Sequence, residues 1–286
     1  MYDMKKVFIF LLLLILVGGG SGYYLYTMKD SPKANSEVRQ NKDVPKQKGK
    51  EIKQGNDSEH KNKKGKEDGK KTDHKKEYTT SPIHFQKVYE LWSKNDIPGA
   101  QKEAEKILAK HPDNLNAAMQ AAYVYKSTTG KPEKSIEILK SFDETYQDNA
   151  LLKSTLGLYY ADTFDHTQFE QALDYAKQGY KIAKNEKKSD NDMVFHVDAY
   201  AWTLGLMQNF DESIYLYQKK IFENKKVTIK DPNSMLHYGM VLVLNNKKEE
   251  AKPIFESILA LKVEDVPKEK QNDLFVAQAT AKANLE

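Results

Sequence analysis

Five small residues recur at nearly equal spacing in the second part of this 286-residue chain. Ala100, Ser135, Ala172, Ser213 and Ala251 are separated by 35, 37, 41 and 38 residues. A period of roughly this length accommodates two helices joined by a turn. No other feature limits the fold as strongly, because such a unit can bury its apolar side only against the next unit.

A second set of small residues precedes the first set by about twelve positions or slightly more, roughly three helical turns. Its members are Ala122, Gly157, Ala201 and Gly239, and the first unit has Val88 at this place. Short side chains on both helices of a hairpin let the two backbones approach each other. The two sets together predict about five helical hairpins within residues 81–286.

Turn-forming residues fall where this register needs them. The expected turns inside hairpins are at Asn95-Asp96, Gly130, Asn209 and Asn245-Asn246. Asp113 and Asn233 are the expected N-caps of two first helices. After Pro267, Leu274, Ala277 and Ala281 recur at helical spacing, which predicts a final amphipathic helix that caps the array.

The units resemble the tetratricopeptide repeat (TPR). The residues that carry the resemblance are Leu156-Gly157 with Tyr160, Ala172 and Ala176, and Tyr238-Gly239 with Leu242, Ala251 and Phe255. The resemblance implies an all-α fold, an α-α superhelix of about five hairpins with a C-terminal capping helix. It also implies a non-catalytic protein that binds other proteins.

In the TPR family the first helix of each hairpin lines a concave groove. The positions that match it here are Tyr89, Trp92, Met119, Tyr123, Lys126, Leu158, Asp162, Asp198, Trp202 and Met240, with Phe85 and Leu236 beside them. This mainly apolar and aromatic set suits an extended peptide or a helix with large side chains. Lys126 and Asn116 are the only candidates for a basic clamp, so capture of a peptide carboxylate is not expected. Each of these residues, taken singly, is equally well explained as core.

The N-terminal segment, residues 1–27, is expected to be a transmembrane signal anchor of the bacterial type. Lys5 and Lys6 precede an uncharged stretch from Val7 to Thr27, which as a helix would be about 31 Å long, enough to span a bilayer. The alternative is a secretory signal that is cleaved near the small residues Gly20-Ser21-Gly22.

Charge near the two ends of the apolar stretch gives opposite indications for its orientation. Lys5 and Lys6 favour a cytoplasmic N-terminus and an exported repeat domain. The reverse is favoured by Lys29, Lys33, Arg39, Lys42 and Lys46. Because a short basic segment directly before the apolar run is typical of an export signal, we expect a single-pass protein of the bacterial cell envelope with extracytoplasmic repeats.

Residues 28–80 are expected to form a disordered, Lys-rich linker. They contain 16 Lys and Arg against 10 Asp and Glu and almost no large apolar residue, so they cannot bury enough surface to fold. Beyond Thr80 the counts are 27 and 30. The alternative function is a secreted or cytoplasm-facing regulator whose basic linker contacts an anionic polymer or nucleic acid. We expect no nucleic-acid partner, because acidic residues interrupt the basic run and no aromatic residue of the linker precedes Tyr78.

Nothing in the sequence predicts catalysis, a metal site or a cofactor. The chain has no cysteine, and its seven histidines show no His-x-x-x-His spacing. Gly130-Lys131 lacks the other residues of a phosphate-binding loop, and no serine lies in a Gly-x-Ser-x-Gly turn. The expected function is therefore an interaction scaffold or adaptor, and the expected partner is a protein or peptide.

Overall fold

A computed structural model describes residues 83–130, 132–266 and 270–286. The predicted anchor (1–27) and linker (28–80) lie outside these ranges. Within them the chain forms eleven α-helices, three short helical turns of other types and no strand. No helix of the described part is both long and apolar enough to cross a membrane.

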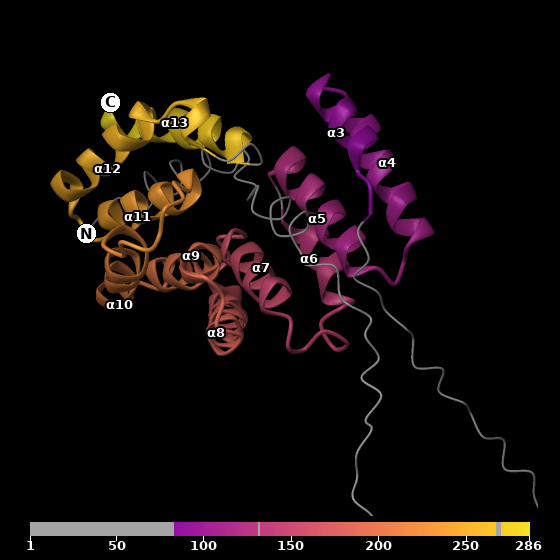
Figure 1. Cartoon of the computed structure of the whole chain (residues 1–286), viewed down its shortest axis with the longest axis horizontal. Helices are drawn as coiled ribbons and strands as arrows, with labels where there is room; N and C mark the ends of the chain where they lie inside the picture. Colours follow the sequence, from indigo (N-terminus) through magenta and orange to yellow (C-terminus); the bar gives the residue numbers. More distant parts are fainter. Residues whose placement is uncertain (1–82, 131, 267–269) are drawn as a thin grey trace, which may run out of the picture. The chain divides into compact units, whose positions relative to one another are not determined.

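The helices pack as consecutive antiparallel neighbours (Figure 1). The five pairs are α3 (Gln86–Ser93) with α4 (Ile97–Lys110), α5 (Leu115–Thr129) with α6 (Glu133–Lys140), α7 (Ala150–Ala161) with α8 (Phe169–Asn185), α9 (Asp190–Leu206) with α10 (Phe210–Leu216), and α11 (Pro232–Leu244) with α12 (Lys248–Ala260). A π-helix, η2 (Tyr217–Phe222), continues α10, and 3-10 turns cover His166–Gln168 and Val263–Asp265. The last helix is α13 (Gln271–Leu285).

This order confirms the predicted all-α array of five hairpins followed by one helix. Each second helix also contacts the first helix of the next hairpin, and α7, α9 and α11 pack on one another in succession. These three first helices form a continuous layer, and side-chain contacts such as Lys126 with Asp162 and Trp92 with Tyr123 link α5 to α7 and α3 to α5. We call the side of the array formed by the first helices the first-helix face. Helix α13 packs on both α12 and α11, so it covers the last hairpin at this face.

The small residues lie where the repeat register predicts them. All five members of the first set are fully buried in second helices. Two predicted pairs touch directly: Ser135 Oγ donates a hydrogen bond of 2.7 Å to the carbonyl of Ala122, and Ser213 Oγ donates one of 2.7 Å to the carbonyl of Ala201. The hydroxyl thereby satisfies its own hydrogen bonding inside the core at the place where the two helices approach.

Three of the predicted hairpin turns contain a residue in the left-handed backbone region. They are Asn95 (φ 59°), Gly130 (φ 66°) and Asn246 (φ 60°). Glycine and asparagine tolerate this region best, which explains why they end these helices.

Both predicted N-caps were wrong by one or two residues. The N-cap of α5 is Asn114, whose side chain accepts from the amide of Ala117 at 2.9 Å, and not Asp113. The N-cap of α11 is Asp231, and Asn233 lies within the first turn. Pro232 occupies the first helical position, where its fixed φ fits and its missing N–H costs nothing, so the cap must precede it.

One buried polar pair joins α7 to α9 inside the core. Ser154 Oγ and His196 Nδ1 are 2.8 Å apart, and both side chains are buried. Burial lowers the pKa of His196 to about 3, and the charge of Lys188 acts in the same direction. Between about pH 6.5 and about pH 3 the imidazole is therefore mostly neutral in the folded protein and mostly protonated in the unfolded chain.

We expect this histidine to make the fold acid-sensitive from about pH 6.5 down to about pH 3, the interval between its pKa in the unfolded and folded states. Throughout this interval the unfolded state binds the additional proton, so the free energy of unfolding falls as pH falls, by about 1.5 kcal/mol between pH 6.5 and pH 5. Urea titrations at several pH values measure this slope, which His196→Asn is expected to remove. His111→Asn, at an exposed position, is the control and is expected to keep it. An equal slope in wild type and His196→Asn would contradict the assignment.

Candidate functional site

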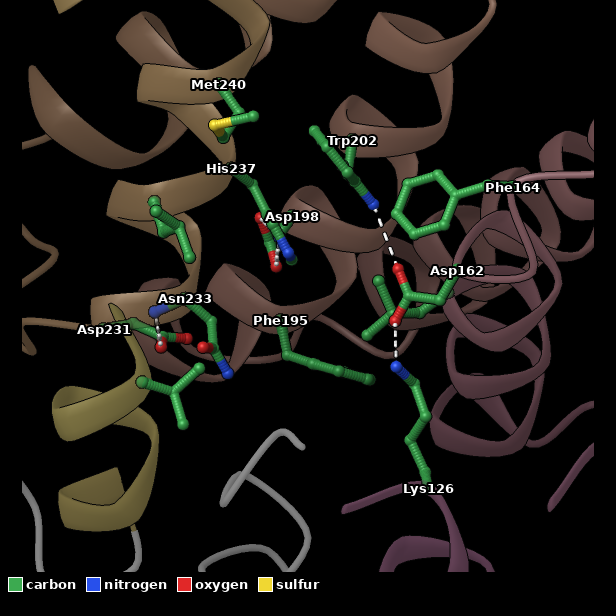
Figure 2. Close-up of a pocket in the computed structure, with 13 residues that line it drawn as sticks. Lys126, Asp162, Phe164, Phe195, Asp198, Trp202, Asp231, Asn233, His237 and Met240 are labelled. Carbon is green, nitrogen blue, oxygen red and sulfur yellow. Dashed lines mark hydrogen bonds and ion pairs between the residues drawn. The ribbon is translucent and has the colours of Figure 1, made fainter. Parts of the chain in front are cut away.

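A small pocket opens on the first-helix face where four hairpins meet (Figure 2). Its volume is about 50 Å³, room for the end of one side chain. Its lining comes from residues within, or next to the ends of, five helices: α5, α7, α9, α11 and α13. The lining residues are Lys126, Leu158, Asp162, Phe164, Phe195, Asp198, Trp202, Asp231, Asn233, Leu236, His237, Met240 and Val276.

An ion pair between the second and third hairpins forms one side of the pocket. Lys126 Nζ of α5 lies 3.1 Å from Oδ2 of Asp162, the C-cap residue of α7, and the lysine is only 5% exposed. The other oxygen, Oδ1 of Asp162, accepts a hydrogen bond of 3.2 Å from the indole nitrogen of Trp202 on α9. One carboxylate thus connects three successive first helices.

Trp202 continues this chain of contacts to α11. Its indole ring stacks on the imidazole of His237, with ring centroids 4.6 Å apart and an interplanar angle of 10°. The tryptophan is only 2% exposed, so its ring belongs to the core beneath the pocket more than to its open surface. Of the two explanations that the sequence allowed for Trp202, groove or core, its burial agrees with the core.

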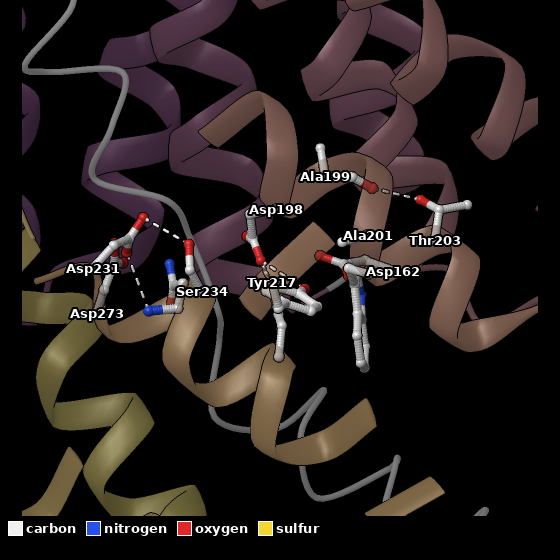
Figure 3. Close-up of polar contacts among 12 residues, drawn as sticks. Asp162, Asp198, Ala199, Ala201, Thr203, Tyr217, Asp231, Ser234 and Asp273 are labelled. Carbon is white, nitrogen blue, oxygen red and sulfur yellow. Dashed lines mark hydrogen bonds and ion pairs between the residues drawn. The ribbon is translucent and has the colours of Figure 1, made fainter. Parts of the chain in front are cut away.

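His237 and Tyr217 share one acceptor, Asp198 (Figures 2 and 3). The Nδ1 atom of His237 lies 3.0 Å from Asp198 Oδ2, and the hydroxyl of Tyr217 donates to Oδ1 at 2.8 Å. Burial by itself lowers the pKa of His237. The pKa is nevertheless raised above its ordinary value, because several acidic neighbours favour the protonated ring more strongly than burial opposes it. The largest of these effects are the charge and the hydrogen bond of Asp198, followed by the charges of Asp162 and Asp231.

The start of α13 is tied to the start of α11 at the far side of the pocket. Lys270 Nζ, at the N-cap of α13, lies 3.3 Å from Oδ2 of Asp231 and 4.0 Å from Asp273. Asp231 also caps α11 and accepts from the hydroxyl of Ser234 at 3.2 Å (Figure 3). Val276 of α13 then lines the pocket, so the predicted capping helix forms part of the site.

Phe164, just after α7, holds a strained backbone conformation beside the pocket. Its φ is 53°, in the left-handed region where a bulky side chain is unfavourable. Its amide donates to the carbonyl of Ala161, and it lies two residues beyond the C-cap Asp162. Lys187 (φ 54°) and Gln208 (φ 64°) adopt the same conformation just after α8 and α9, outside the pocket, so the φ angle by itself does not mark a site.

The structure brings together six of the ten predicted groove residues. The six that line the pocket are Lys126, Leu158, Asp162, Asp198, Trp202 and Met240. Leu236, which was predicted beside them, lines it as well. The other four of the ten are on α3 and α5 and do not line the pocket; three of them, Tyr89, Trp92 and Tyr123, form an aromatic cluster, and the fourth is Met119. There the ring of Trp92 lies 6.3 Å from that of Tyr89 and 5.7 Å from that of Tyr123, and Met119 and Tyr123 are buried.

Several pocket residues were not predicted from the sequence. Phe195 precedes Asp198 by three positions and Trp202 by seven, and His237 precedes Met240 by three. Residues at these spacings share one helical face, so extending the predicted stripe by one turn would have found both. Phe164, Asp231 and Val276 had no such signal, because they lie outside the first helices or on α13.

The pocket is suited to recognising a side chain. Its walls are mostly apolar, with a few oriented polar groups, which is the composition typical of binding sites. No group of three or more His, Asp and Glu side chains in the described ranges is arranged to hold a metal ion.

Comparison with known proteins indicates which fold this is. No family model matches the chain. It is 26% identical over 209 residues to the human interferon-induced protein with tetratricopeptide repeats 2, a match that covers 70% of this chain and 44% of that protein. This chain thus spans less than half of that relative's length.

Solved structures give a similar result. The chain superimposes on TTC0263, a thermophilic TPR protein of Thermus thermophilus, with a TM-score of 0.50 and 16% identity, over 68% of this chain and 95% of that one. MamA superimposes with a TM-score of 0.42 and 18% identity, over 70% of this chain and 99% of that one. Together with the five hairpins, the likeness to TTC0263 shows a TPR-like fold.

Proposed function

We propose that this TPR-like chain is a membrane-anchored interaction scaffold that binds a protein or peptide on its first-helix face and catalyses no reaction. The observation that carries the proposal is the pocket, because four successive first helices and α13 converge on it. A partner that contacts this face would touch several repeats at once, as an extended peptide or a helix does.

The polar contacts beneath the pocket support a preformed site. Lys126, Asp162 and Trp202 hold one another across three helices, and Asp198 orients both His237 and Tyr217. Side chains held in this way lose little further freedom when a partner binds, which lowers the entropic cost of association.

The ring of Phe164 also supports binding at this place, because this residue lines the pocket. An aromatic ring at the pocket offers a large, rigid contact surface to a partner.

Site-specific photo-crosslinking with the full chain in its own cells tests the proposal. The photoreactive residue p-benzoylphenylalanine is placed at Phe164 and, separately, at Tyr215, an exposed ring on α10 that is 54% accessible and outside the pocket. We expect a discrete crosslinked protein at Phe164 and none at Tyr215. Crosslinks from Tyr215 alone, or none at either position, would contradict the proposal.

The membrane tether is a separate part of the proposal and rests on the sequence of residues 1–80. We expect protease added to intact cells to digest the repeat domain, because the basic residues before the apolar stretch favour an exported C-terminus. An immunoblot against the repeats measures the loss, and a cytoplasmic protein in the same lysate is the control. Full protection, followed by digestion after lysis, would support the cytoplasm-facing alternative instead.

A further inference from the structure

The charge of the pocket favours one kind of partner group. Its lining contains three aspartates, Asp162, Asp198 and Asp231, against one lysine and one histidine. Lys270 pairs with Asp231 and lies 4.0 Å from Asp273, so the group at the pocket has four aspartates against two lysines. Its net charge is −2 when His237 is neutral and −1 when it is protonated. Both lysines are paired with aspartates, Lys126 with Asp162 and Lys270 with Asp231, so an entering carboxylate would meet a net negative charge.

The rest of the lining is apolar and mostly aromatic or long-chained. It consists of Leu158, Phe164, Phe195, Trp202, Leu236, Met240 and Val276, with Asn233 as the other polar residue. A side chain that matches both parts of such a pocket has an apolar stem and a cationic end. Aromatic rings add attraction for a cation near their faces.

The carboxylates retain capacity for further hydrogen bonds. An ionised carboxylate offers about four acceptor positions. The contacts of Asp162 are with Lys126 and Trp202, and those of Asp198 are with Tyr217 and His237. A guanidinium group, with its planar fork of donors, could bond to these oxygens and stack on an aromatic ring at the same time.

We propose that this pocket binds the side chain of one arginine in the partner, with its guanidinium group directed to Asp162 and Asp198. The inference rests on the proposed function and specifies the chemistry of the partner. The volume of about 50 Å³ limits the pocket to the end of a single side chain, so the remainder of the partner must contact the first-helix face around it.

Selection of peptides on the full chain, held in mild detergent, provides the test. A phage-displayed library of random dodecapeptides is the probe, and we expect the enriched sequences to share an arginine. The best peptide is then synthesised with arginine and with citrulline, which keeps the shape of arginine without its charge. In fluorescence anisotropy we expect the citrulline peptide to bind about tenfold more weakly, or weaker still.

Two variants test whether the difference in affinity between the arginine and citrulline peptides arises in the pocket. Asp198→Asn lowers the negative charge by one and keeps an oxygen acceptor for Tyr217, so we expect it to remove most of the difference between arginine and citrulline. Asp162→Asn keeps an acceptor for Trp202 but removes the counter-charge of Lys126, so it is the second such variant on condition that its circular dichroism is native. Asp211→Asn removes a charge at an exposed position outside the pocket and is expected to keep the full difference.

Several results would overturn the inference. They are equal affinity of the arginine and citrulline peptides for the wild-type chain, enrichment of acidic or purely apolar peptides, and an undiminished difference in Asp198→Asn with native circular dichroism. Such results leave peptide binding on this face intact. Absence of any enriched peptide, together with no crosslink at Phe164, would contradict the proposed function as well.

Discussion

Replacing Asp162 with leucine is expected to lower the free energy of unfolding by about 3 to 5 kcal/mol. The substitution leaves the ammonium group of Lys126 inside the protein with its ion-pair partner removed. It also removes the acceptor of the Trp202 indole N–H. A buried charge without a counter-charge is among the most costly defects in a folded protein. Urea unfolding followed by far-UV circular dichroism measures the loss.

The double variant Lys126→Met with Asp162→Leu is the matched control. It removes both charges together and fills the space with apolar side chains of similar size, so we expect most of the lost stability to return. About 1 kcal/mol is expected to remain lost, because the indole N–H of Trp202 still has no acceptor. A loss below about 1 kcal/mol in the single variant would show that the ion pair is hydrated in solution.

The second large effect is expected for Gly157→Ala, a loss of about 3 kcal/mol in the free energy of unfolding. A Cβ atom at Gly157 would lie 2.5 Å from the backbone nitrogen and 2.7 Å from the Cα of Ala176. Backbone atoms of a packed helix cannot move aside locally, so α7 and α8 must separate. This cost exceeds the gain of about 1 kcal/mol that alanine brings to a helix interior.

Gly205→Ala serves as the control for this substitution. There the added Cβ would meet mainly one side-chain atom, Cγ2 of Val241 at 2.4 Å, with the next atom at 3.3 Å. A single methyl group can shift at a smaller cost than a helix backbone, so we expect the loss to be smaller than at Gly157 by about 1 kcal/mol or more. The same urea titration compares the two, and equal losses would contradict the explanation by backbone contact.

Contacts on the first-helix face link neighbouring repeats directly. Lys126, Asp162, Trp202 and His237 belong to four successive hairpins and touch in that order. In a repeat protein, stability is close to a sum of the repeats and of the interfaces between neighbours. Asp162 and Trp202 each contact both neighbouring hairpins, so they contribute to the stability of the fold as well as to the shape of the pocket.

Replacing Tyr123 or Trp202 with alanine would not test partner binding separately from folding. Both side chains are buried, and Trp202 also carries the hydrogen bond to Asp162. Truncating a buried aromatic residue typically costs about 3 to 5 kcal/mol, so binding and folding would be lost together. Phe164 and Val276 are only partly buried and line the pocket, which makes them better positions for probing the face.

The hairpin order was predictable because it depends on local periodicity. Ala100 to Ala251 recur at the length of one hairpin, and small residues are needed wherever two helices approach closely. Hairpin turns were predictable for the same reason, since Asn95, Gly130 and Asn246 suit a backbone conformation that few other residues tolerate. The exact N-cap positions were not predictable. At the start of α11, for example, Asp231, Pro232 and Asn233 all suit a helix N-terminus, and only the backbone geometry shows that Asp231 is the cap.

Periodicity in the sequence, together with its resemblance to the TPR, was enough to predict the class of the fold, the positions of the hairpins and seven of the residues that line the pocket. Tertiary packing brought Asp198 into contact with His237 and placed Val276 at one side of the site. It also placed Tyr89 and Trp92 in a cluster apart from the pocket. Periodicity along a helix states which residues share a face. Which faces meet depends on how successive hairpins are rotated and where the last helix returns, and those angles follow from the packing of all side chains together.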